Sequence, residues 1–433
     1  MASTSLSRTQ TGTITNNKIA TFSFWIKRSG ISSYQDPMSA VSGGDYAQIQ
    51  FTNTDNLSIY QRDTTTTMQV VTSRVFRDVG AWYHIVVALD TTQATASDRV
   101  KIYVNGVQET SFGTSTYPAQ NLVLRLNTAS HAQSVGAYST SSNYVDGSMT
   151  HFHQIDGTAY AASTFGETDS TTGIWEPKAS PSVTYGNNGF FLKFENSGSM
   201  GTDSSGNANN FTVNGTLTQT VDSPGNNFAT LNPLYPYTST GAFTNGNTAP
   251  SDYNAVQGIV GTLGVSTGKW YYEVKINGNA PSEIGMVGWG ARDNGAINFS
   301  GGEAYDYCRY NFTTSYYNNG SATAISGASA YSAGDICGCA IDLDNNYIYW
   351  YKNGVLENSG GTAITASSTA GNYFPLVRNG NGNNIQCNFG NGYFGTTAVA
   401  SAGTSSTGDN SIWEYDCPSG YYGLNTKNIN TYG

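Results

Sequence analysis

Short stretches in which apolar and polar residues alternate, and which end in Gly, Asn or Ser, recur along this sequence and limit the folds that it allows. Alternation with a period of two is typical of strands with one buried and one water-facing side, as in antiparallel sheets. In residues 269–276 the expected core side comprises Trp270, Tyr272, Val274 and Ile276, and the expected water-facing side comprises Lys269, Tyr271, Glu273 and Lys275.

Two other alternating stretches contain the dipeptide Asn-Gly. Residues 99–107 include Asn105-Gly106, and residues 346–355 include Asn353-Gly354. Both residue types tolerate a positive φ, so the pair favours a two-residue hairpin turn of type I′. Because the same arrangement occurs in both halves of the chain, we expect two related sandwiches in tandem.

Composition supports an all-β fold. Charged residues make up 11% of the 433 residues, against roughly 25% in ordinary soluble domains. Long helices are normally rich in Ala, Leu, Glu and Lys, whereas this chain has 50 Gly and 13% aromatic residues. We predict two tandem antiparallel β-sandwiches, or jelly rolls, joined by an Asn/Gly-rich connector.

Charge and hydropathy exclude two classes of partner. The net charge is -10 and no basic cluster occurs, so we expect no nucleic-acid binding. No stretch approaches the ~18 consecutive apolar residues of a membrane span, so we expect no membrane insertion. The first ten residues lack the apolar region of a secretory signal. We expect the protein to stay in the cytoplasm or to leave it by another route.

Composition shifts divide the chain into four parts. We predict a jelly roll at residues 1–182, a connector with a short hairpin at 183–248, a second sandwich at 249–395 and a docked, aromatic-rich C-terminal segment at 396–433. In the connector, residues 190–194 and 211–213 are the strand candidates, and we expect them to pack on a neighbouring sheet. The five Cys include Cys337 and Cys339 on one strand face; without C-x-x-C spacing, we expect reduced, buried thiols.

Ordered motifs indicate known families. Residues 20–27, 82–90, 100–106 and 134–149 resemble the landmarks of a laminin-G-like, concanavalin-A-type domain. Residues 268–274, 284–288, 334–342, 348–354 and 387–390 are similar in order to a SPRY domain. Cys339 lies where such domains commonly carry a core cysteine.

Both ends of the chain carry a further resemblance. With residues 5–8, 24–28 and 417–428, the whole chain resembles virion appendage proteins of tailed bacteriophages. The resemblance implies assembly in the host cytoplasm, a location in the virion and release by lysis. It also implies other virion proteins and a host cell-surface glycan as partners, and a homo-oligomer, by analogy a trimer.

The sequence offers little for catalysis. It lacks the Glu-x-Asp-x-Glu run of related glucanases, and the spacing of Glu303 and Asp306 puts them on opposite faces of a strand. His84 is expected to be structural. His151 and His153 share a strand face but would need a third ligand to bind a metal. We therefore expect a protein that is not an enzyme.

Calcium is the one candidate cofactor that the sequence suggests. Residues 203–209 are rich in oxygen donors but poor in carboxylates, which favours an Asx-turn loop over a tight Ca²⁺ site. We expect no cofactor, with Ca²⁺ as the alternative.

A binding surface is the favoured functional feature. Sugar recognition uses aromatic rings against the apolar face of a pyranose and planar polar groups for its hydroxyls. Residues of these types gather in two segments of the second half. The predicted ligand-binding residues are Tyr305, Tyr307, Arg309, Tyr310, Tyr316, Tyr317, Asn318, Arg378 and Asn379.

The sequence therefore predicts a non-enzymatic phage structural protein, a tail-fibre or appendage subunit that binds host-surface polysaccharide during adsorption. Two alternatives remain open. The first is a capsid-decoration or architectural protein that binds other virion subunits, and the second is a polysaccharide depolymerase.

Overall fold

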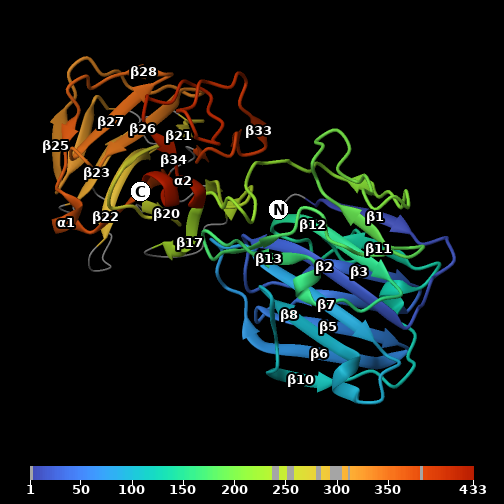
Figure 1. The fold of residues 1–433 in the computed structure, drawn as a ribbon. Coiled ribbons are helices and arrows are strands. Elements are labelled where there is room, and N and C mark those ends of the chain that lie inside the picture. Colours follow the sequence, from blue (N-terminus) through green and yellow to red (C-terminus); the bar gives the residue numbers. More distant parts are fainter. Residues whose placement is uncertain are drawn as a thin grey trace. The chain divides into compact units, whose positions relative to one another are not determined.

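The chain folds into two compact units, residues 1–219 and 220–433, shown in the computed structural model of Figure 1. The structure describes residues 3–236, 243–250, 258–278, 284–292, 305–310, 313–380 and 384–433. Within them the α-helices are two short ones, α1 (Ser367–Ala370) and α2 (Thr426–Tyr432). No helix of this described part is long and apolar enough to cross a membrane. The all-β prediction is confirmed.

The first unit pairs an eight-stranded with a six-stranded antiparallel sheet. The first has the order β10 (Phe112–Thr116), β6 (Thr65–Val75), β5 (Asn56–Asp63), β4 (Asp45–Phe51), β3 (Gln35–Ser42), β11 (Ala132–Val135), β1 (Ser5–Thr9) and β16 (Thr212–Asn214). The second has the order β15 (Phe190–Leu192), β12 (Gly147–Asp156), β2 (Ile19–Arg28), β7 (Tyr83–Asp90), β8 (Val100–Val104) and β9 (Val107–Gln108). The remaining elements are β13 (Gly166–Thr168), β14 (Trp175–Pro177) and 3₁₀ turns at Ala96–Arg99, Arg125–Asn127 and Ala162–Thr164.

The strands expected in the connector belong to this first unit. β15 pairs with β12 in the six-stranded sheet, and β16 pairs with β1 in the eight-stranded sheet. They pack on sheets as expected, but they pair with different neighbours and not with each other in a hairpin. The boundary between the units therefore falls after residue 219, inside the segment predicted as a connector.

The second unit also has two main sheets. One has the order β17 (Leu231–Pro236), β20 (Gly258–Gly261), β30 (Asn372–Gly380), β22 (Ile284–Arg292), β23 (Asp306–Tyr310), β24 (Ser315–Asn318) and β25 (Ser321–Ala324). The other has the order β28 (Val355–Leu356), β27 (Tyr347–Lys352), β26 (Ile336–Asp342), β21 (Lys269–Lys275) and β31 (Gln386–Asn388), with β29 (Thr362–Ala363) on β27 and β34 (Tyr422–Gly423) on β21. Two short pairs complete it, β18 (Phe243–Thr244) with β19 (Ala249–Pro250) and β32 (Tyr393–Phe394) with β33 (Thr397–Ala398).

Several local predictions are confirmed. Asn105 and Gly106 have φ of 47° and 84°, and Asn353 and Gly354 have φ of 48° and 79°, so each pair has the two positive values of a type I′ turn. All five Cys are buried free thiols. Cys337 and Cys339 lie in the core between the two main sheets of the second unit.

The prediction of a water-facing side for β21 is wrong for its two central residues, whereas Lys269 and Lys275 at the strand ends are partly exposed. Tyr271 and Glu273 are 1% and 0% exposed, because the C-terminal segment lies over them. The Trp413 ring packs edge-on against Tyr271 at 5.0 Å between ring centroids. The Glu273 carboxylate accepts hydrogen bonds from the backbone N–H groups of Glu414 (2.9 Å) and Tyr415 (3.0 Å). Burial raises the pKa of Glu273 to about 7, and these hydrogen bonds oppose the shift.

His84 is structural in this fold. Its ring is fully buried and stacks on Trp25 at 4.6 Å between centroids. The Trp175 indole N–H donates to Nδ1 of His84 at 2.9 Å, so the ring proton lies on Nε2 and is donated to the Ser23 hydroxyl at 2.9 Å. Burial lowers the pKa of His84 to about 3.

We expect Trp413→Ala to lower the free energy of unfolding of the second unit by about 3–5 kcal/mol, because a fully buried indole is lost. Denaturant titration of the full chain measures this change. As a control, Tyr347→Ala removes a ring that is 36% exposed on the same sheet and should change it by less than about 1 kcal/mol. Equal effects of the two variants would contradict burial by the C-terminal segment.

We expect the first unit to lose stability as the pH falls below about 6.5, because the unfolded imidazole of His84 then takes up a proton while the folded one stays neutral down to about 3. Urea midpoints at pH 7.5 and 5.0 measure the loss. His84→Gln should show a smaller difference between the two midpoints than the natural chain. An identical pH difference in both proteins would refute the role of His84.

Candidate functional site

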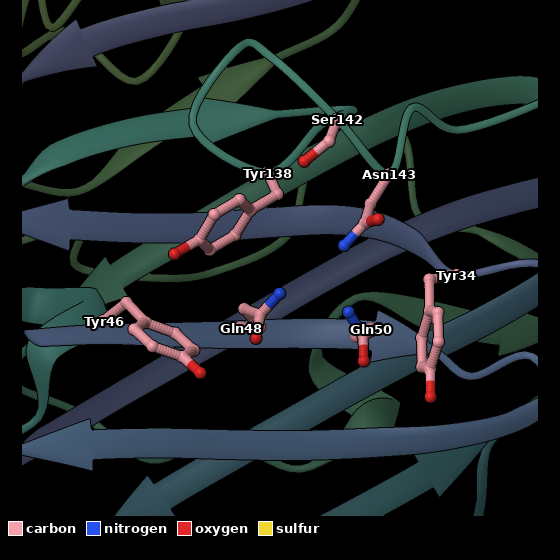
Figure 2. A pocket seen from close by; sticks show the side chains of 7 residues that line it. All are labelled: Tyr34, Tyr46, Gln48, Gln50, Tyr138, Ser142 and Asn143. Carbon is pink, nitrogen blue, oxygen red and sulfur yellow. The ribbon is translucent and has the colours of Figure 1, made fainter. Parts of the chain in front are cut away.

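A groove of about 350 Å³ lies on the outer face of the eight-stranded sheet in the first unit (Figure 2). It is lined by aromatic and uncharged polar side chains from β4, from the segment before β3 and from the loop after β11. These residues are Tyr34, Tyr46, Gln48, Gln50, Tyr138, Ser142 and Asn143.

Strand alternation in β4 places three of these side chains. The even-numbered residues Tyr46, Gln48 and Gln50 point to the outer face, where Tyr46 and Gln50 are partly exposed and Gln48 is 7% exposed. Ala47, Ile49 and Phe51 are fully buried in the core. If the pairing of β4 slipped by one residue, the polar side chains would be buried and the apolar ones exposed. Packing of the apolar residues in the core therefore fixes the row of Tyr46, Gln48 and Gln50 on the outer face.

The aromatic rings lie at the two ends of this row. Tyr46 stacks on Tyr60 at 5.5 Å between centroids, and Tyr138 meets Tyr46 edge-on at 5.6 Å. Figure 2 shows Tyr46 and Tyr138 at one end and Tyr34 at the other, with the two glutamine amides between them. Tyr34 is 47% exposed, so its ring is available to a ligand.

A buried carboxylate holds the amides of the groove. Asp36 of β3 is fully buried and accepts hydrogen bonds from Nε2 of Gln48 (2.6 Å), Nε2 of Gln50 (2.7 Å) and Nδ2 of Asn143 (3.4 Å). Its backbone N–H donates to the carbonyl of Asn143 at 2.9 Å, which ties the loop to the sheet. Burial raises the pKa of Asp36 to about 6, and the three amide hydrogen bonds oppose the shift.

The arrangement suits binding of a neutral ligand. Flat rings offer apolar area, and the amides between them offer directional hydrogen bonds. The lining residues named above include no carboxylate or imidazole, so they supply no acid and base pair for glycoside hydrolysis. Across the part of the chain that the structure describes, no three His, Cys, Asp or Glu side chains gather as a metal site.

The two motifs considered for metal binding are used inside the fold. Asp203 accepts hydrogen bonds at 2.8 Å from the backbone N–H groups of Phe191, Ser205 and Asn209, which is the Asx-turn arrangement. His153 stacks on Phe191 at 3.8 Å between centroids, and His151 packs on the same ring at 5.8 Å.

The structure does not bring the nine predicted ligand-binding residues to one surface. Four of the side chains are buried: Tyr307 is 6%, Arg309 1%, Arg378 3% and Asn379 0% exposed. Contacts within the unit engage these side chains: Tyr307 packs in the main core, whereas Arg378 lies against Met286 on the other face of the sheet. Tyr307, for example, accepts a hydrogen bond from the backbone N–H of Thr365 at 3.0 Å, and Asn379 donates to the carbonyl of Pro250 at 3.1 Å.

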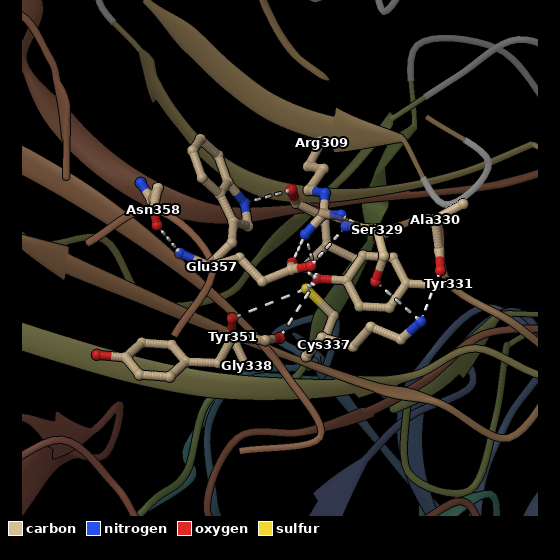
Figure 3. A network of polar contacts seen from close by, with 12 residues as sticks. Arg309, Ser329, Ala330, Tyr331, Cys337, Gly338, Tyr351, Glu357 and Asn358 are labelled. Carbon is tan, nitrogen blue, oxygen red and sulfur yellow. Dashed lines mark hydrogen bonds and ion pairs between the residues drawn. The ribbon is translucent and has the colours of Figure 1, made fainter. Parts of the chain in front are cut away.

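Arg309 is the clearest case of a structural role (Figure 3). Its guanidinium pairs with the carboxylate of Glu357 and donates to the carbonyl of Ser329 at 2.5 Å. It also lies 4.5 Å from the ring centroid of Tyr331, and the Tyr331 hydroxyl lies 3.0 Å from Sγ of Cys337. The Glu357 carboxylate balances the buried charge of Arg309, which would otherwise carry a large desolvation cost.

The other predicted residues lie on different faces of the second unit. Tyr316 stacks on Trp350 at 5.7 Å and lines a second groove of about 400 Å³. Tyr317, the next residue in β24, packs against a small apolar cluster outside the main core, formed by Val260, Met286, Cys308 and Leu376. Tyr305 packs against the main core. Asn318 donates to the carbonyl of Asp306 at 3.1 Å. The side chain of Tyr310 lies outside the described residues.

Sequence reasoning missed the first-unit groove. The one local signal of this groove in the sequence was the alternation of Tyr46, Gln48 and Gln50 with three apolar residues. This pattern places uncharged polar residues on a strand face where charged residues are more usual. Tyr34, Tyr138 and Asn143 join this row only through strand pairing, which no local pattern reveals.

Two tandem β-sandwiches, the first with a ring-and-amide groove, define a modular all-β protein. Residues 2–163 match the Concanavalin A-like lectin/glucanases superfamily, and residues 269–392 match the SPRY domain. The chain thus contains a laminin-G-like, concanavalin-A-like domain followed by a SPRY domain, as its motifs predict.

Individual relatives match the chain only in part. The chain is 32% identical over 124 residues to the E3 ubiquitin-protein ligase RKP of Arabidopsis thaliana, a match that covers 28% of this chain and 9% of that ligase. The crystal structure of the SPRY domain of human HERC1 is similar with a TM-score of 0.30 and 16% identity, covering 36% of this chain and 96% of that one.

We expect Glu357→Ala to lower the free energy of unfolding of the second unit by about 3–5 kcal/mol, because it leaves the buried Arg309 charge unpaired. Chemical denaturation of the full chain gives the value. The double variant Arg309→Met, Glu357→Met removes both charges and should recover much of the loss. A double variant as unstable as Glu357→Ala would disprove the unpaired charge as the cause.

Proposed function

We propose that this chain is a non-catalytic binding protein whose first-unit groove holds a segment of a cell-surface polysaccharide. The observation that carries the proposal is the row of Tyr46, Gln48 and Gln50 on one outer sheet face, completed by Tyr34 and Tyr138. Rings at both ends of a row of amides match the alternation of C–H faces and hydroxyl groups along a sugar chain.

We further propose that the protein acts as a virion appendage or tail-fibre subunit that attaches a phage to its host. Support comes from the resemblance of both chain ends to such proteins and from the low charge of the groove. A shallow site binds one sugar segment weakly, so repeated copies in a homo-oligomer, by analogy a trimer, would raise the overall affinity. The SPRY domain then remains for contacts with other virion proteins.

A glycan array probed with the full chain, followed by titration of the bound glycans, tests the binding function. We expect Tyr46→Ala and Tyr34→Ala to weaken binding about five- to tenfold each, because a stacking ring is lost. Tyr347→Ala, which removes an exposed ring of the SPRY unit, is the matched control and should leave the affinity unchanged.

Three outcomes would count against the proposal. Absence of any bound glycan, together with tight binding to capsid or tail subunits, would favour an architectural protein. Equal loss in the control and groove variants would place the binding site elsewhere. Release of reducing sugar from a bound polysaccharide would establish a depolymerase instead.

A further inference from the structure

We propose that Asp36 determines the ligand class of the groove: it turns the amide nitrogens of Gln48, Gln50 and Asn143 inward, so that the groove accepts an uncharged, hydroxyl-rich saccharide and rejects the corresponding uronic acid. The inference rests on the proposed function and deepens it. Asp36 acts as a positioning residue, because it is buried beneath the amides that would touch the ligand.

The orientation of the amides follows from the chemistry of a carboxylate. An ionised carboxylate only accepts hydrogen bonds, so an amide next to it must present its N–H group. Three amides do so at Asp36, with donor distances of 2.6, 2.7 and 3.4 Å. Figure 2 shows the nitrogens of Gln48, Gln50 and Asn143 converging on one region between them. The carbonyl oxygens consequently face away from Asp36.

This orientation selects among saccharides. Outward carbonyl oxygens need hydrogen-bond donors, and every sugar hydroxyl supplies one. A uronic acid replaces a hydroxymethyl group with a carboxylate, which has no proton to give and is repelled by the carbonyl dipoles and by the Asp36 charge. A ligand that leaves polar groups of the site without hydrogen bonds binds more weakly, because those groups have lost their contacts with water and gained none in return.

Asp36 has few charged neighbours among the described residues. On the loop after β11, burial raises the pKa of Tyr138, and the Asp36 charge adds to this shift. On β4, the groups that face it are the uncharged amides of Gln48 and Gln50. The nearby cation is Arg62 of β5, which acts on Tyr46 and Tyr138 and donates to the carbonyl of Gly44 at 2.6 Å.

The same geometry makes binding depend on pH. Because the pKa of Asp36 is raised to about 6, the carboxylate is ionised at pH 7.5 and protonated at pH 5. A protonated carboxyl donates a hydrogen bond of its own, which allows one amide to turn its nitrogen outward. We expect the affinity for a neutral saccharide to fall about fivefold from pH 7.5 to pH 5, the effect of losing one well-placed hydrogen bond.

The test uses six hexamers as probes: those of mannose, galactose and glucose, and those of the three corresponding uronic acids. Each is titrated against the full chain at pH 7.5 and pH 5. We expect a neutral hexamer to bind at least tenfold more tightly than its uronic acid partner at pH 7.5. In Asp36→Asn the pH dependence should vanish, whereas the control Asp98→Asn removes an equal charge at a 48% exposed side chain and should keep it.

The outcomes separate the two proposals. Equal or tighter binding of the uronic acid hexamer, for instance through Arg62, overturns the ligand class, and so does a pH-independent affinity of the natural chain. Binding to none of the six hexamers also overturns the ligand class, whereas binding to no glycan of the array overturns the proposed function as well. If Asp36→Asn fails to fold, the pH dependence of saccharide binding by the natural chain still tests the proposed role of Asp36.

Discussion

A carboxylate that is taken out of water must collect hydrogen-bond donors, and the irregular parts of both units depend on this requirement. Asp156 at the end of β12 accepts from the backbone N–H groups of Thr15 (2.7 Å), Asn16 (3.1 Å) and Asn188 (3.1 Å). Asp203 organises its own loop in the same way, and Glu273 holds the C-terminal segment on the SPRY sheet. Long loops with little secondary structure thereby gain fixed positions.

The same requirement operates at the groove. Asp36 uses side-chain amides as its donors, so the cost of burying its charge is offset by ordering the groups that line the surface above it. The surface that results is flat, aromatic and uncharged. This is the surface on which we propose that a sugar chain binds reversibly.

Much of the fold could be predicted because strand alternation and turn chemistry are local. The hairpins at Asn105-Gly106 and Asn353-Gly354 need only the φ preferences of two adjacent residues. The site could not be predicted in the same way. In β23 the alternation of Tyr307, Cys308 and Arg309 shows which residues share a face, but the structure turns Tyr307 and Arg309 into the sandwich. Arg309 can be buried because its charge pairs with Glu357, a residue that is distant in the sequence.

The sequence by itself determined the all-β class, the two sandwiches with their family motifs, and the sides to which successive side chains point. Tertiary structure alone decided what covers each side. The polar face of β21 is dry because residues some 140 positions later supply donors for Glu273, and the polar face of β4 stays a groove because Tyr138 and Asn143 reach it from the loop after β11. A period of two is a property of one strand, whereas coverage of a face is a property of its neighbours.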